Sequence, residues 1–211
     1  MYKVLLWSLK IGSVVNLYFL FLTFQLPLVK VDLNLLIPAQ IFFFVSAYRC
    51  FFPVNYVANT VLHDSRLSSV FITRFLATFV EVAYIYQFSY LLRIINNNQI
   101  LYLDVISWLM VLQAVISQLF VWCAILLKNE KYYYYEEIGW AIIFILNTII
   151  SVILYLRLDL VACQKLLMQI NLLFGFIYLP WQWVHLHSIY IRVGKRKFIK
   201  KFQRYNILDN L

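Results

Sequence analysis

The sequence predicts an all-α, polytopic integral membrane protein: a helical bundle of six transmembrane helices with the N- and C-termini on the same, cytoplasmic side. Of its 211 residues, 64% are hydrophobic and only 13% are charged, whereas soluble domains are about half apolar and a quarter charged. Its mean hydropathy is +0.80. With only four Gly and four Pro, the chain has few turn signals, which favours long continuous helices. It lacks the alternating segments of about ten residues that are typical of a transmembrane barrel.

Six apolar stretches are long enough to cross a membrane, which takes about 20 residues of helix. The expected spans are approximately residues 11–29, 33–52, 67–92, 101–127, 135–156 and 160–191. Pro180 lies inside the last span, which is long enough to be tilted or kinked there. We therefore expect one six-helix transmembrane domain over residues 1–192, followed by a basic cytoplasmic tail over residues 193–211.

The distribution of basic residues predicts the orientation. Seven of the 18 Lys and Arg lie in "RVGKRKFIKKFQR", residues 192–204. A basic run directly after a membrane helix is typical of a cytoplasmic anchor that contacts anionic lipids, so the lipid bilayer is the expected partner and nucleic acid is not. An even number of spans places the N-terminus on the same side. The sequence leaves open whether this is a plasma or inner membrane or an organelle membrane.

Polar residues gather at one predicted level of the bundle. Odd-numbered spans begin on the tail side and even-numbered spans end there, so one leaflet holds all three histidines, an acidic pair and three arginines: His63, His185, His187, Asp64, Glu136, Glu137, Arg49, Arg66 and Arg74. Each has a structural explanation, such as an N-cap at Asp64 or Ser65 or a headgroup contact for Arg49. Charged groups inside membrane spans are costly and mark function by default. The predicted position of these residues in one leaflet therefore still suggests a functional site.

Arg74 and Glu81 lie on one face of the third span. Seven residues separate them, roughly 10 Å at 1.5 Å per residue, which predicts that they are too far apart for direct contact. We therefore expect other partners, such as Glu136 or Glu137 for Arg74. Glu81 lies near mid-membrane and is the strongest single candidate for function, with helix packing as the alternative.

The polar level suggests an intramembrane enzyme that acts on a lipid or another amphiphile. The candidate catalytic residues are His63, Asp64, Glu81, Glu136 and Glu137, and the candidate substrate-binding residues are Arg49, Arg74, Trp181 and Trp183. A metal held by His63, His185 and Glu137 is a further hypothesis, for which zinc or iron would suit the donors. Haem held by two histidines is a weaker alternative. His185 and His187 are two residues apart and point to different faces, so at most one of them belongs to such a site.

Two other classes of function stay open. One is a proton- or ion-coupled transporter or channel that uses Glu81 as its titrating carboxylate. The other is a non-catalytic subunit of a membrane complex, whose partners would be further copies of the chain or other subunits. A compact His/Asp/Glu cluster favours the enzyme, and a continuous polar route past Glu81 favours transport. Burial of Glu81 and Arg74 in pairs, with large apolar faces toward other chains, favours the subunit.

Overall fold

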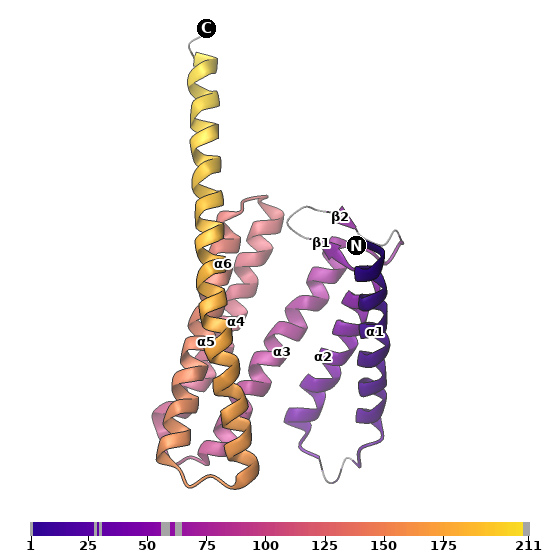
Figure 1. Ribbon diagram of the computed structural model, residues 1–211, viewed down its shortest axis with the longest axis vertical. Coiled ribbons are helices and arrows are strands. Elements are labelled where there is room, and N and C mark those ends of the chain that lie inside the picture. Colours follow the sequence, from indigo (N-terminus) through magenta and orange to yellow (C-terminus); the bar gives the residue numbers. More distant parts are fainter. Residues whose placement is uncertain (1, 28, 30, 56–59, 62–64, 209–211) are drawn as a thin grey trace. The chain divides into compact units, whose positions relative to one another are not determined.

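The computed structural model contains six long helices and one short hairpin (Figure 1). It describes residues 2–27, 29, 31–55, 60–61 and 65–208; of residues 2–3, 55, 60–61 and 194–208 only the backbone is described. The helices are α1 (Tyr2–Phe24), α2 (Leu33–Phe51), α3 (Val70–Asn96), α4 (Leu101–Leu126), α5 (Lys131–Arg157) and α6 (Ala162–Leu208). Strands β1 (Val54–Asn55) and β2 (Thr60–Val61) pair antiparallel. All six helices are long and apolar enough to cross a membrane, which confirms the predicted helical class and the number of spans.

The chain forms two compact units, Met1–Ile94 and Ile95–Leu211. In unit 1, α1 packs against α2, and hydrogen bonds join both ends of α2 to α3 or to the segment just before it. In unit 2, α5 packs against both α4 and α6. Successive helices run antiparallel within each unit (Figure 1). The single six-helix domain and the cytoplasmic placement of both termini stay predictions.

Lys10 explains why α1 begins earlier than expected. The first span was expected over residues 11–29, but α1 covers Tyr2–Phe24 and includes Lys10. The Lys10 ammonium donates to the carbonyl oxygen of Phe51 at 2.9 Å and lies 3.9 Å from the centre of the Phe51 ring. The lysine therefore satisfies a carbonyl in the last turn of α2, and the helix continues through it. At the other end α1 stops at Phe24, three residues before Pro27.

The other helix ends differ from the expected ones for local reasons. α3 begins at Val70, where the hydroxyl of Ser69 accepts from the amide of Ile72 at 3.4 Å. The predicted N-cap at Ser65 is therefore wrong, and Asp64 lies outside the described residues. α3 ends at Asn96 and is followed by Asn97 and Asn98, whose positive φ angles of 46° and 58° suit asparagine. α6 continues through Pro180.

Unit 2 has a polar centre between α5 and α6. The side-chain amides of Asn147 and Asn171 donate to each other at 2.9 and 3.3 Å, and Asn171 also donates to the Ser151 hydroxyl at 2.7 Å. All three residues are buried. Hydrogen bonds between helices are a main source of association in lipid, where the hydrophobic effect does not drive helices together.

α4 and α5 approach closely at Gly139. A Cβ atom at this position would lie 2.0 Å from the Ser117 hydroxyl oxygen and 2.7 Å from the Gln113 amide nitrogen. Only a residue without a side chain fits there, and small residues at such crossings let helix backbones pack tightly in membranes.

In unit 1, polar side chains join the start of α2 to the end of α3. Asp32 accepts from the backbone amide of Asn34 at 2.8 Å and from the Tyr90 hydroxyl at 2.6 Å. Tyr86 donates to the Asn34 side chain at 2.9 Å. The Arg93 guanidinium lies 5.9 and 5.6 Å from the centres of the Tyr86 and Tyr90 rings. Asp32 thus caps α2 and ties it to α3 at the same time.

Asp32 should make the stability of unit 1 depend on pH. The Tyr90 hydroxyl, and then the Asn34 amide, lower the pKa of Asp32. Its stabilising effect is therefore fully present above the unfolded pKa of about 3.9 and is lost as the pH falls through the lower folded value. In detergent, Asp32→Asn should lower the melting temperature at neutral pH, and the gap to the parent should close below about pH 4. Tyr90→Phe removes the hydroxyl that lowers the pKa of Asp32 most, so the melting temperature of this variant should depend less on pH than that of the parent. A difference between Asp32→Asn and the parent that stays the same at every pH would contradict this role of Asp32.

Gly139→Ala should destabilise unit 2 by about 1–3 kcal/mol, because the added methyl group overpacks the α4–α5 crossing. Ser117→Gly should restore part of the loss. Gly12→Ala is the matched control: its Cβ would meet only the Cys50 sulfur at 3.7 Å, so this helical glycine should tolerate alanine. Unfolding in mixed detergent micelles measures all three. Equal effects of the two glycine substitutions would show that the crossing is not close-packed.

Candidate functional site

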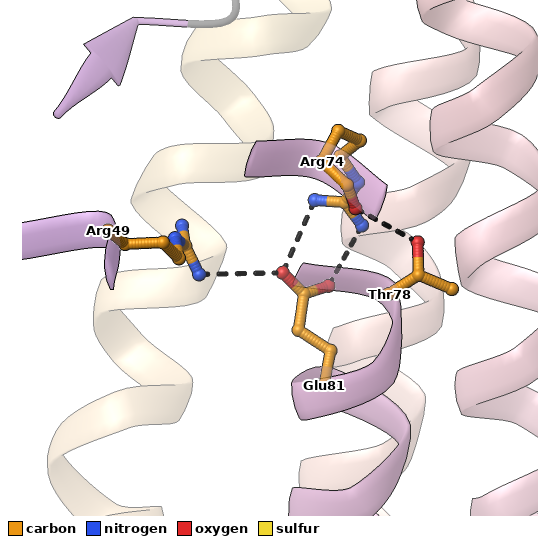
Figure 2. A network of polar contacts seen from close by, with 4 residues as sticks. All are labelled: Arg49, Arg74, Thr78 and Glu81. Atoms are coloured by element: carbon orange, nitrogen blue, oxygen red, sulfur yellow. Dashed lines mark hydrogen bonds and ion pairs between the residues drawn. The ribbon is translucent and has the colours of Figure 1, made fainter. Parts of the chain in front are cut away.

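Two clusters of charged residues lie among the described side chains, one in each unit. In unit 1, Arg74 and Glu81 of α3 form a two-pronged ion pair: Nη1 lies 3.2 Å from Oε1 and Nη2 lies 3.0 Å from Oε2 (Figure 2). The Arg74 side chain is 5% exposed and that of Glu81 is 18% exposed. Thr78, between them, donates to the Arg74 carbonyl oxygen at 3.1 Å.

The predicted separation of Arg74 from Glu81 is therefore wrong. The expectation considered the rise of the helix, roughly 10 Å over seven residues, but not the reach of the side chains. Side chains on a helix lean toward its N-terminus, so Glu81 leans toward Arg74, whose long side chain covers the remaining distance. The pairing gives Glu81 a cationic partner on its own helix. The transporter hypothesis, which uses Glu81 as a titrating carboxylate, stays a prediction.

Arg49 of α2 approaches the same carboxylate. Its Nη1 atom lies 4.0 Å from Glu81 Oε1, and its side chain is 38% exposed (Figure 2). Two predicted substrate-binding residues, Arg49 and Arg74, and one predicted catalytic residue, Glu81, thus lie together in unit 1. At 4.0 Å, the Arg49 contact is at the outer limit of an ion pair and is weaker than the two-pronged bond of Arg74.

The second cluster lies between α5 and α6 of unit 2. Glu137 Oε1 lies 3.3 Å from His185 Nε2, and Glu137 Oε2 accepts from the Gln182 side-chain amide at 2.8 Å. The same amide nitrogen donates to the Glu137 carbonyl oxygen at 2.9 Å. Both carboxylate oxygens are thus held, one by an amide and the other by an imidazole.

The surroundings of this cluster orient the His185 ring. The Trp181 ring stacks on it with centroids 5.1 Å apart and planes 6° apart. The His185 side chain is 32% exposed and that of Glu137 is 23% exposed, so both can be reached from outside the helix pair. A carboxylate that binds one nitrogen of an oriented, accessible imidazole suits acid–base chemistry at the other nitrogen.

Several predicted site residues lie elsewhere. His63 and Asp64 lie outside the described residues, so their predicted roles stay untested. Glu136 is buried on α5. His187 points to another face of α6, where it lines a pocket together with Trp183. His185 and His187 therefore do diverge, as their spacing predicts.

The metal hypothesis gains no third ligand from the residues that the structure describes. Within that part of the chain, no group of three His, Cys, Asp or Glu side chains could hold a metal ion. His185 and Glu137 are two of the three predicted ligands, and His63 is the third. Binding of zinc, iron or haem therefore stays a prediction, and each of these sites would need His63 as a ligand.

Gln182 is the member of the cluster that the sequence analysis did not single out. It is 1% exposed and lies three residues before His185, on the same face of α6. A glutamine at this spacing from a histidine, inside an apolar helix, is the signal that could have identified it.

Disrupting the Arg74–Glu81 pair should test its contribution to stability. Arg74→Met and Glu81→Leu should each cost about 3 kcal/mol, because each leaves the other charge largely buried without this partner. The double variant should cost less than the sum by about 1–3 kcal/mol. Reversible unfolding in mixed micelles gives the four free energies of the cycle. Additive costs would show that the pair is not coupled.

Comparisons of this chain with protein-family models, with curated proteins and with solved structures found no match. The six apolar helices are those of a multi-pass membrane protein, and any finer function has to be inferred from the two clusters themselves.

Proposed function

We propose that the chain is a membrane enzyme that acts on an amphiphile through Glu137 and His185 in unit 2. The observation that carries this proposal is the pair of contacts on the Glu137 carboxylate, with Gln182 at one oxygen and His185 at the other. Gln182 fixes the carboxylate, which in turn fixes the imidazole. Such a sequence of orienting contacts is typical of catalytic bases.

His185 is the proposed catalytic residue, and Glu137 is its positioning residue. When His185 Nε2 carries the hydrogen and donates it to Glu137, Nδ1 has a lone pair that can accept a proton from a hydroxyl group of the substrate or of water. The Glu137 carboxylate then stabilises the imidazolium. The 3.3 Å contact is long, but catalytic hydrogen bonds commonly shorten when the substrate binds.

The location of the pair supports an amphiphilic substrate. His185 lies seven residues before Arg192, where the basic part of α6 begins, and Glu137 lies six residues after the start of α5. These positions are roughly 10 Å from the ends of the apolar parts of the two helices, near the level where headgroups meet acyl chains. Trp181 stacks on His185 and is 56% exposed, as befits an aromatic residue at a membrane interface.

A second candidate is a non-catalytic subunit of a membrane assembly. The Arg74–Glu81 pair supports it, because this pairing neutralises the most deeply placed charges of α3 and leaves them a packing role. Under this alternative, Glu137 and His185 would join α5 to α6, and their loss would affect stability or assembly only. A role of Arg49 and Arg74 in binding an anionic headgroup stays a prediction.

The enzyme proposal predicts distinct effects of substitutions at the two residues. The full chain is purified, reconstituted into vesicles of a total lipid extract from the expressing cells, and followed by mass spectrometry for time-dependent conversion of a lipid. His185→Gln should lower kcat by at least about 100-fold, the contribution of a general base. Glu137→Gln should lower kcat less, with KM kept, because it acts through His185.

Glu130→Gln is the matched control, since it removes a carboxylate from the same end of α5 but outside the cluster. Its kcat should stay within about twofold of the parent value. The general-base contribution of at least about 100-fold comes from His185, which Glu137 positions, and not from Glu130. If the parent converts no lipid, or if the His185 and Glu130 variants behave alike, the enzyme proposal is wrong. Loss of stability alone in the His185 and Glu137 variants would favour the subunit alternative.

A further inference from the structure

A small pocket between α5 and α6 has aromatic walls. Tyr134 of α5 and Trp183, Leu186, His187 and Tyr190 of α6 line it, and its volume is about 230 Å³. The α6 residues follow the spacing i, i+3, i+4, i+7, which places them on one helix face. Gln182 and His185 lie on a neighbouring face, so this pocket is distinct from the Glu137–His185 pair.

Two of the rings that line the pocket are in contact with each other. The Tyr134 and Tyr190 rings lie with centroids 6.1 Å apart and planes inclined by 46°. Trp183 is 75% exposed and Tyr190 is 64% exposed, so the pocket opens away from the helix pair. Pockets that bury drug-sized ligands are about 300–1,000 Å³, and this smaller one fits a compact chemical group.

We propose that this pocket is an aromatic cage for the quaternary ammonium headgroup of a membrane lipid. The faces of Trp and Tyr rings carry negative potential and attract cations within about 6 Å, and such cages recognise quaternary ammonium ions. The five lining residues include no carboxylate, so a diffuse, weakly hydrated cation suits them better than an ammonium that needs hydrogen-bond acceptors.

The level of the pocket selects a lipid as the source of this group. Tyr134 lies three residues after the start of α5, and Tyr190 lies two residues before Arg192, where the basic part of α6 begins. At 1.5 Å per residue, both lie roughly 5 Å or less from the ends of the apolar parts of their helices, where lipid headgroups are found. A headgroup with a trimethylammonium end, as in phosphatidylcholine, would enter from the bilayer side.

The test is native mass spectrometry of the full chain in detergent with equal amounts of phosphatidylcholine and phosphatidylethanolamine that share the same acyl chains. The parent should retain phosphatidylcholine with about tenfold preference, the size of one or two cation–π contacts. Trp183→Leu and Tyr190→Leu should each reduce the preference severalfold, whereas Trp183→Phe should keep most of it. Trp7→Leu, which removes an exposed tryptophan from α1 in unit 1, is the matched control and should leave the preference unchanged.

Three outcomes would overturn the proposal. The first is equal retention of the two lipids by the parent, and the second is an equal loss of preference in the Trp7 and Trp183 variants. The third concerns the source of the cation: soluble tetramethylammonium that binds as tightly as phosphatidylcholine would show that the pocket does not select a lipid. None of these measurements depends on lipid conversion, so the cage and the enzyme proposal succeed or fail separately.

Discussion

The structure depends on one constraint, which is that a polar group inside a membrane span has to find its partners within the protein. Lipid offers no hydrogen bonds, so an unpaired charge or amide in a span is costly. In unit 1, the guanidinium of Arg74 meets the carboxylate of Glu81 on the same helix. In unit 2, the buried amides of Asn147 and Asn171 meet each other. The amide pair fixes how α5 packs against α6, because neither amide can turn toward lipid without losing the other, whereas the ion pair balances two charges within α3.

The helical class and the number of spans follow directly from the sequence, because crossing hydrocarbon requires about 20 apolar residues, and the chain provides six such stretches. The helix ends are harder to predict, because they depend on single side chains. Lys10 looks like an interruption of the first span, yet its ammonium reaches the Phe51 carbonyl oxygen of a different helix. Ser69, and not Ser65, precedes α3, because the hydroxyl of Ser69 is the one that reaches the amide of Ile72.

The candidate site is predictable only in part, for a similar reason. Alternation of the spans brings Glu137 and His185 to the same end of unit 2, as the sequence indicates. It does not reveal that Gln182 holds the second carboxylate oxygen, because that contact depends on the rotation of α6 about its own axis. The pairing of Arg74 with Glu81 was missed because helical rise alone ignores the reach of two long side chains.

Glu81 and Glu137 are both carboxylates in apolar helices, and their surroundings separate their roles. Glu81 faces two arginines, and its closer partner, Arg74, is only 5% exposed, so its carboxylate is paired with guanidinium groups that have no lone pair to accept a proton. Glu137 faces an amide and an imidazole, and an imidazole has a second ring nitrogen that can accept a proton. A carboxylate among guanidinium groups stabilises structure, whereas one beside an accessible imidazole can support proton transfer. This difference in partner is why the proposed chemistry is assigned to α5 and α6 and not to the more deeply placed charge of α3.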